Sequence, residues 1–347
     1  MINLDAMLSE LASADPIFSP STFWDDINVK NIRMLEAEGL ANFKRTVSQN
    51  YFNWLIADHT HPYFKHVFHQ WRAHPNFLPL LTRLGETRRL RLTTANERRN
   101  LSLYERQIYR LYVCFVWTIM MQNDRHGLRH RIQEPKIGNP FPIRYGTQIL
   151  SQDLASSIME CNIIADLTKT RLLPKIAEVG AGYGRVAQAY VSALSGKYFI
   201  FDIPPALGVA EWYLEQTVGS NRVFKFRRFD KMADIQAELN DCSVALFTAN
   251  QIQKFPDQYF DVSLSISTLP EMRPDQVKMY LKELQRITSG QIFLKQWRNW
   301  KNPLDGTDLS ASDYEFSDRW TLTLDRTDPV IPDFFNRVWS THSGSVT

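Results

Sequence analysis

Glu178-Val-Gly-Ala-Gly-Tyr-Gly184 is the stretch that decides the fold, because its three glycines stand where a short apolar run ends and a helical pattern begins. The apolar run, 175–179, is typical of a buried strand. Glycines at such a turn let a ligand approach the backbone closely, and the amides of the following helix point toward it. A dinucleotide-binding turn has the spacing G-x-G-x-x-G, whereas here Arg185 stands at the position of its last glycine. The stretch therefore favours a cofactor without a pyrophosphate.

A carboxylate stands at the end of the next apolar run. Asp202 closes the run 198–202, roughly 20 residues past the glycines, where a carboxylate can accept hydrogen bonds from both ribose hydroxyls of a nucleoside. Asp202 could instead cap the helix expected to start at Pro204, and the two roles are compatible. Together the glycines and Asp202 predict a nucleoside site.

Short apolar runs alternate with helical segments from Lys175 onward, which predicts a parallel sheet with crossover helices. The strands are expected near 175–179, 198–202, 243–249, 261–267 and 291–296. The helices are expected near 184–194, 205–217, 231–239 and 274–287. A further run, 222–229, competes with 243–249 for the place of the third strand. Two late runs, 320–324 and 334–339, predict a terminal hairpin.

The chain before residue 150 has mainly helical periodicity. Two apolar stripes recur at helical spacing: Phe43, Val47, Tyr51 and Leu55, and then Tyr104, Ile108, Leu111 or Tyr112, Phe115 and Ile119. Residues 135–142 are rich in proline and predict an extended arm. Ser151 and Asp153 are candidate caps for a helix that runs through Ile163. We expect a helical N-terminal domain over 1–150 and a cofactor-binding domain over 151–347.

Composition narrows the class of protein. With 44% hydrophobic and 22% charged residues the chain should form a globular fold, and a net charge of +3 argues against a nucleic-acid partner. No apolar run reaches the roughly 20 residues of a membrane span. Three separated cysteines suggest neither disulfides nor zinc and favour the cytoplasm. Clustered histidines lack further ligands, so no metal site is expected. Whether the chain forms a homo-oligomer stays open.

Polar residues also follow the later strands. Asn250 and Gln251 come after the run 243–249, where their amides could contact the edge of an adenine ring. Glu271 follows the run 261–267, at the carboxyl edge where open parallel sheets bind ligands. A carboxylate there can act as a general base on a hydroxyl. Glu271 could instead orient its loop or cap the helix that opens at Pro274.

These residues resemble the Rossmann-like class I methyltransferases that use S-adenosylmethionine, and more narrowly a family of sugar O-methyltransferases. The narrower resemblance covers most of the chain. It rests on separated blocks that occur in the same order: Gly39–Val47, Asn50–Trp54, Glu134–Pro140, Ser151–Leu154, Glu178–Arg185, Asp202–Pro205 and Ser267–Met272.

The resemblance implies a seven-stranded sheet whose last strand pair includes an antiparallel member, with a helical N-terminal cap. It implies S-adenosyl-L-methionine as cofactor and S-adenosyl-L-homocysteine as product. The cofactor contacts it implies are Glu178, Gly180, Gly182, Gly184 and Asp202. Related enzymes often have Asp at the adenine-side position that Asn250 occupies here. Arg185 either holds the methionine carboxylate of the cofactor or is solvated.

The resulting hypothesis is methyl transfer to a hydroxyl of a sugar, either in a small molecule or in a glycan. Glu271 or Asp153 would take the proton, Asp153 because the arm 135–153 is expected to fold against the sheet edge. Three alternatives remain: a methyltransferase acting on another small-molecule or natural-product acceptor, a nicotinamide-dependent oxidoreductase, and a non-catalytic interaction protein with a cofactor pocket.

Overall fold

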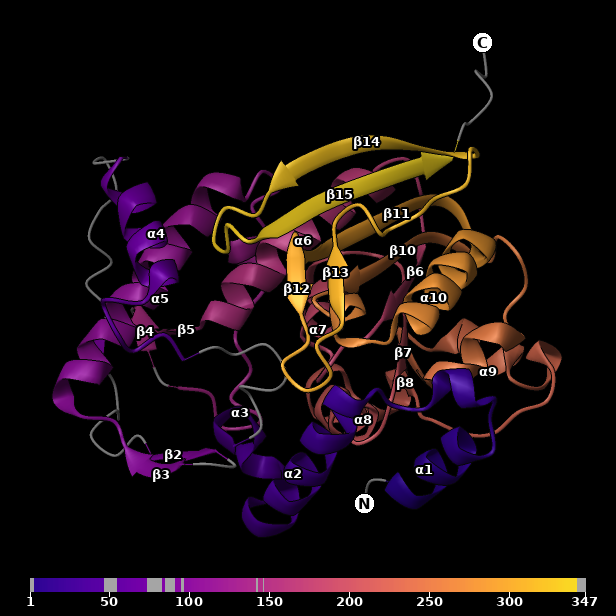
Figure 1. The fold of residues 1–347 in the computed structure, drawn as a ribbon, viewed down its shortest axis with the longest axis horizontal. Coiled ribbons are helices and arrows are strands. Elements are labelled where there is room, and N and C mark those ends of the chain that lie inside the picture. The colour runs from indigo at the N-terminus through magenta and orange to yellow at the C-terminus, as the bar shows by residue number, and fades with distance from the viewer. Residues whose placement is uncertain are drawn as a thin grey trace. The chain divides into compact units, whose positions relative to one another are not determined.

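The computed structural model describes residues 3–46, 55–73, 83–84, 91–94, 97–141, 143–145 and 147–341. Contacts group the chain, which Figure 1 draws from its N-terminus to its C-terminus, into two compact units. The first comprises residues 1–28, 166–328 and 333–347, and the second comprises 29–165 and 329–332. The units are discontinuous along the chain, and the start of the chain groups with the glycine stretch. The predicted domain division at residue 150 stays a prediction.

The first unit is built on an eight-stranded sheet in which six neighbouring strands are parallel. Its strands, in order across the sheet, are β14 (Trp320–Thr327), β15 (Phe334–Thr341), β11 (Thr288–Trp297), β10 (Phe260–Ile266), β6 (Lys175–Val179), β7 (Lys197–Asp202), β9 (Val244–Thr248) and β8 (Val223–Phe224). Strand β15 runs antiparallel to both β11 and β14. The predicted α/β class, the terminal hairpin and the antiparallel member are confirmed.

Of the two runs that could form the third strand, 243–249 is the one that lies beside β7. Strand β9 lies beside β7 and all five of its residues are buried, whereas 222–229 supplies only β8, two residues at the sheet edge. This edge strand is the eighth, beyond the seven predicted. A strand buried on both faces reads as a continuous apolar run, and 243–249 is such a run.

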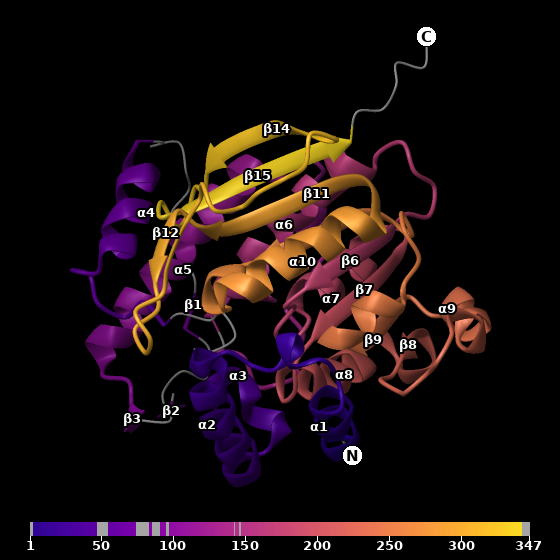
Figure 2. The same ribbon diagram turned by 45° about the vertical axis from the view of Figure 1, so that its right-hand side comes forward.

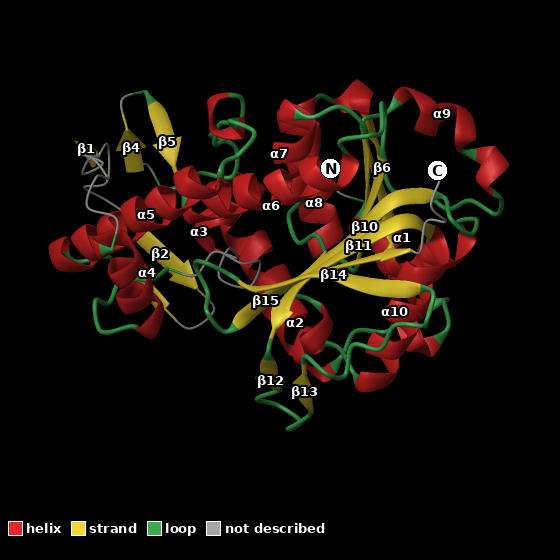
Figure 3. Cartoon of the chain, turned by 90° about the horizontal axis from the view of Figure 1, so that it is seen from above, coloured by secondary structure: helices red, strands yellow, loops and turns green. Residues whose placement is uncertain are grey.

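Helices cover both faces of this sheet (Figure 3). Phe201 of β7 stacks on Phe247 of β9 with ring centroids 5.5 Å apart, and both belong to the core shared with α10. Tyr198 of β7 points to the other face and packs on Tyr190 of α7 at 5.5 Å. The two sides of one strand are therefore buried by different helices. Figure 2 shows α10 against the sheet.

The crossover helices follow the prediction closely, with one correction. The helices and turns of the first unit are α1 (Leu4–Ala12), η1 (Pro16–Phe18), α7 (Arg185–Ala193), α8 (Ala206–Val218), η6 (Ser220–Arg222), η7 (Met232–Asp234), α9 (Gln236–Asp241), η8 (Ala249–Lys254), η9 (Leu269–Glu271) and α10 (Pro274–Ile287). The predicted helix 231–239 is wrong as one element, because it is divided between η7 and α9. The Asp234 carboxylate accepts a hydrogen bond from the Lys231 amide at 3.0 Å, which favours a tight local turn.

A small hairpin that the sequence analysis did not predict follows β11. It consists of β12 (Asn299–Lys301) and β13 (Asp308–Ser310), which pair in antiparallel register. Its Trp300 lies 5.1 Å from Trp297 between ring centroids, and Trp297 lies 4.7 Å from Phe334. Aromatic packing therefore ties the hairpin to the end of β11.

The second unit contains helices and short antiparallel strands. Its elements are η2 (Leu40–Asn42), α3 (Phe43–Thr46), α4 (Pro62–Arg72), β1 (Arg83–Leu84), β2 (Arg91–Thr94), β3 (Glu97–Asn100), α5 (Leu103–Asn123), η5 (Leu128–His130), β4 (Ile143–Tyr145) and β5 (Gln148–Leu150). Two helices have residues in both units, α2 (Thr22–Glu38) and α6 (Gln152–Thr168). The short strands were not predicted. In the part of the chain that the structure describes, no helix is long and apolar enough to cross a membrane.

The predicted helical stripes are confirmed in part. In α5, Ile108, Tyr112, Phe115 and Ile119 are buried, but Tyr104 is 54% exposed, so the stripe begins one turn later than expected. In the other stripe, Phe43 is buried and Leu55 is half-buried, while Val47 and Tyr51 lie outside the described residues. Helix α6 begins as predicted, because the Ser151 hydroxyl accepts a hydrogen bond from the Leu154 amide at 2.9 Å. Asp153 lies inside the first turn of α6 and is not the cap.

A capping box starts α5, and we expect its removal to destabilise the protein. The Ser102 hydroxyl accepts from the Glu105 amide at 3.2 Å, and the Glu105 carboxylate accepts from the Ser102 amide at 2.8 Å. Ser102→Ala should lower the free energy of unfolding by about 1 kcal/mol, measured by urea denaturation. Ser102→Asp keeps an acceptor at the cap and should unfold like the wild type. Equal losses in both variants would contradict a capping role.

Candidate active site

The glycine stretch forms a tight loop between β6 and α7. Gly180, Gly182 and Gly184 have φ angles of +77°, +59° and +78°, a region that other residues rarely adopt. A Cβ on Gly180 would lie 2.2 Å from the Thr268 side chain, and the Thr268 hydroxyl donates a hydrogen bond to the Gly180 carbonyl at 3.0 Å. The loop is therefore held against the end of β10 with no space for a side chain at its first glycine.

Asp202 is bonded directly to this loop. One carboxylate oxygen accepts from the Gly182 amide at 2.8 Å and the other accepts from the Ile203 amide at 2.7 Å. Burial raises the pKa of Asp202 to about 7, against the opposing effect of the amides of Ile203, Gly182 and Ala181. Each carboxylate oxygen has a second lone pair, so the group can accept further hydrogen bonds from a diol. The alternative role as a helix cap is wrong, because α8 begins at Ala206 without a side-chain cap.

Glu178 and Arg185 flank the loop inside the protein. Glu178 is buried near the end of β6 and accepts a hydrogen bond from the Tyr198 hydroxyl at 2.8 Å. Arg185 is the first residue of α7 and is only 7% exposed. The alternative that Arg185 is a solvated side chain is therefore wrong. A guanidinium buried in the first turn of a helix opposes the helix dipole, which favours a nearby negative charge.

The two amides after β9 have different environments. Gln251 is fully buried; its side-chain oxygen accepts from the Thr248 amide at 3.1 Å and its nitrogen donates to the Arg227 carbonyl at 3.0 Å. These bonds close the turn η8. The Asn250 nitrogen donates to the Glu10 carboxylate at 3.1 Å, while its oxygen is buried without a hydrogen-bond partner among the described residues. Of the two predicted adenine contacts, Asn250 is the one whose side-chain oxygen has no hydrogen-bond partner among the described residues.

Glu271 ends η9, directly after β10. Burial raises the pKa of its carboxyl to about 8; a hydrogen bond from the Trp24 side chain opposes this rise, and the negative charge of Asp202 adds to it. The two carboxyls are thus close enough to influence each other's charge. Glu271 does not cap α10, because the N-cap residue is Arg273, whose amide donates to the Gln276 side chain at 3.1 Å.

Asp153, the other predicted base, lies in the second unit. It is buried in the first turn of α6, and its negative charge adds to the effect of burial in raising the pKa of Tyr109. Among the described residues no group of three or more histidines, cysteines and carboxylates could hold a metal ion.

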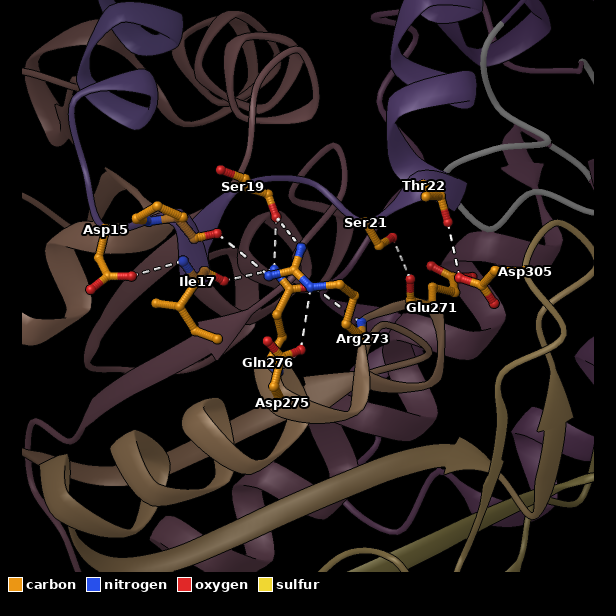
Figure 4. A network of polar contacts seen from close by, with 11 residues as sticks. Asp15, Ile17, Ser19, Ser21, Thr22, Glu271, Arg273, Asp275, Gln276 and Asp305 are labelled. Carbon is orange, nitrogen blue, oxygen red and sulfur yellow. Dashed lines mark hydrogen bonds and ion pairs between the residues drawn. The ribbon is translucent and has the colours of Figure 1, made fainter.

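An N-terminal segment that the sequence analysis missed crosses this part of the first unit (Figure 4). We call Asp15–Trp24 the N-terminal strap. Gln276 donates from its side chain to the carbonyls of Ile17 and Ser19, at 2.8 and 2.7 Å. The Ser21 hydroxyl donates to the Glu271 carbonyl at 2.6 Å. These bonds join the start of the chain to residues some 250 positions later, and no local pattern in the sequence signals them.

Comparison with known proteins gives a likeness of fold only. No protein-family model matches the chain, and no curated protein does. The PH0226 protein from Pyrococcus horikoshii OT3 is 11% identical, aligned over 54% of this chain and 90% of its own, with a TM-score of 0.37. A SAM-dependent methyltransferase from Leishmania major is 15% identical, aligned over 52% and 71%, with a TM-score of 0.35. At this identity and coverage the alignments do not identify the reaction that the chain catalyses.

Proposed function

We propose that the chain is a methyltransferase that uses S-adenosylmethionine. The observation that carries the proposal is the bond between the glycine loop and Asp202, from the Gly182 amide at 2.8 Å. This bond places a carboxylate beside three glycines at the carboxyl ends of parallel strands, where such sheets bind nucleosides. Asn250, after the neighbouring strand, has a side-chain oxygen without a partner among the described residues, and we propose that the base donates to it. Glu178 and Arg185 are the proposed contacts of the methionine part.

The proposed chemistry needs little from the protein beyond alignment and a base. S-adenosylmethionine supplies a methyl group on a positively charged sulfur, already activated for attack by an oxygen nucleophile. The acceptor hydroxyl would lose its proton as its oxygen gains the methyl group, and we assign that proton to Glu271. A base with a pKa of about 8 holds a proton weakly enough to exchange it near neutral pH.

The proposed acceptor is a hydroxyl of a sugar in a small molecule or a glycan. The support for a sugar is the resemblance of the sequence blocks, several of which meet inside the second unit. The Lys44 ammonium pairs with the buried Glu134 carboxylate at 2.5 Å, and Ser151 donates to the same carboxylate at 2.5 Å. Gln152 is fully buried, and neither polar atom of its amide has a partner among the described residues. Side chains from three of these blocks are therefore buried within the second unit.

The proposal predicts which nucleotide the protein binds. Isothermal titration of the wild type should show binding of S-adenosylhomocysteine and none of NAD. Asp202→Asn should bind S-adenosylhomocysteine about 10- to 100-fold more weakly, because an amide cannot accept all the hydrogen bonds that the carboxylate accepts. Asp257→Asn, which changes an exposed carboxylate paired with Arg286, is the matched control and should bind normally. Binding of NAD alone would overturn the proposal in favour of an oxidoreductase.

A further inference from the structure

Helix α1 brings a buried carboxylate to the side chain of Asn250. Leu11 of α1 is part of the core on the α10 face of the sheet, which fixes the helix in place. The preceding residue, Glu10, is 7% exposed. Its carboxylate accepts from the Asn250 amide nitrogen at 3.1 Å and pairs with Arg228 at 3.0 Å and with Lys254 at 3.8 Å. Glu10 is thus held by two cations while it contacts Asn250.

The charge of Glu10 determines which way the Asn250 amide faces. A carboxylate only accepts hydrogen bonds, so the amide must turn its nitrogen toward Glu10 and its oxygen away. The reverse orientation would place two oxygens in contact. The oxygen that faces away is buried and has no partner among the described residues. A buried acceptor without a partner is uncommon in native proteins, and a donor from a bound ligand would satisfy it.

The sheet register indicates which donor is missing. Asp202 of β7 pairs with Thr248 of β9, and Asn250 follows two residues later. Asp202 and Asn250 thus lie at the carboxyl ends of neighbouring strands, where a nucleoside with its ribose at Asp202 can present its base to Asn250. Adenine carries an amino group at its sixth position, which donates, whereas hypoxanthine carries an oxygen there, which accepts. An acceptor with a fixed orientation favours the first base and repels the second.

We propose that Glu10 is a positioning residue that fixes the Asn250 amide so that its oxygen selects a purine with a 6-amino group. The inference rests on the proposed function, because it assigns a determinant of base specificity within the same cofactor site. It gives α1 a role in recognition although Glu10 itself touches no ligand. Arg228 and Lys254 support this role by stabilising the negative charge of Glu10.

The test compares two ligands that differ in the group at the sixth position of the base and in the proton that the 6-oxo base carries on N1. S-adenosylhomocysteine and S-inosylhomocysteine are titrated calorimetrically into each full-length variant. The wild type should prefer the adenosyl compound by about 10- to 100-fold. Glu10→Gln replaces the carboxylate with an amide that can donate or accept, so Asn250 can turn and the preference should fall to within about threefold. Both ligands meet the same preparation, so partial unfolding of a variant changes both titrations and leaves the ratio unchanged.

Two further variants test whether the preference depends on Asn250 and whether it depends on Glu10. Glu238→Gln changes an exposed partner of Arg227 and should keep the wild-type ratio. Asn250→Ala removes the selecting oxygen and should abolish the preference. If Asn250→Ala loses the preference while Glu10→Gln keeps it, Glu10 does not position the amide and the inference is wrong. Equal binding of both ligands to the wild type also overturns it. If neither ligand binds the wild type, the proposed function itself fails.

Discussion

Alanine in place of Gly180 is expected to destabilise the protein and to abolish its cofactor site. The residue has a φ of +77°, which costs a non-glycine residue about 1–2 kcal/mol. The added Cβ would also lie 2.2 Å from the Thr268 side chain, so the loop and the end of β10 would have to separate. Such overpacking costs about 1–3 kcal/mol more. Urea denaturation and titration with S-adenosylhomocysteine measure the two losses.

Gly306 offers a matched control for this substitution. Its φ is +75°, but a Cβ there would meet no atom within 4 Å. Gly306→Ala should therefore show the backbone cost alone, and it should bind S-adenosylhomocysteine like the wild type. The difference between the two variants isolates the contact with Thr268. If Gly180→Ala and Gly306→Ala are destabilised equally and both bind, the tight packing of the loop has no role in the site.

The sheet could be predicted from the sequence because its central strands are buried on both faces. Such strands read as continuous apolar runs, and the runs at 175–179, 198–202 and 243–249 match β6, β7 and β9 within one residue at each end. The glycines and Asp202 could be predicted for the same reason, since they follow these strands directly. The short strands of the second unit and the hairpin β12–β13 could not, because two to four residues are too few to show a period.

The contacts between distant residues could not be predicted. Asn250 and Gln251 are adjacent amides, and nothing in the sequence indicates that one closes a turn while the other keeps an open acceptor. The partner that distinguishes them, Glu10, lies 240 residues away in the chain. The strap contacts of Gln276 go to main-chain carbonyls, which every residue carries. Residue types therefore identified the strands and the loop, but not the groups that orient the side chains around them.

Glutamine in place of Glu271 is expected to lower the turnover of methyl transfer by about 10²- to 10⁴-fold, the usual contribution of a positioned general base. The amide has nearly the same shape but cannot take a proton, so the Kd of S-adenosylhomocysteine should change little. Transfer of a labelled methyl group from S-adenosylmethionine to a panel of sugars and glycosides measures turnover. Calorimetric titration measures the Kd.

The pH dependence separates a base from a structural carboxyl. A base acts when deprotonated, so wild-type turnover should rise with pH up to about 8, the pKa of Glu271, and then level off, while the residual turnover of Glu271→Gln should lack this rise. Stability should change in the opposite sense. The pKa lies above its ordinary value of 4.5, so the native state without ligand should lose stability as pH rises from about 4.5 to about 8, and the variant should lose less over that range.

Glu211 provides the control, because burial raises the pKa of its carboxyl too, but it lies on α8 and accepts from the Phe226 amide at 2.8 Å. Glu211→Gln should alter the pH dependence of unfolding and leave turnover and its pH profile unchanged. A Glu271→Gln variant with normal turnover and a weakened Kd would instead make Glu271 a binding residue. If Asp153, the other carboxylate predicted as base, takes the proton instead, Asp153→Asn should abolish the rise of turnover with pH.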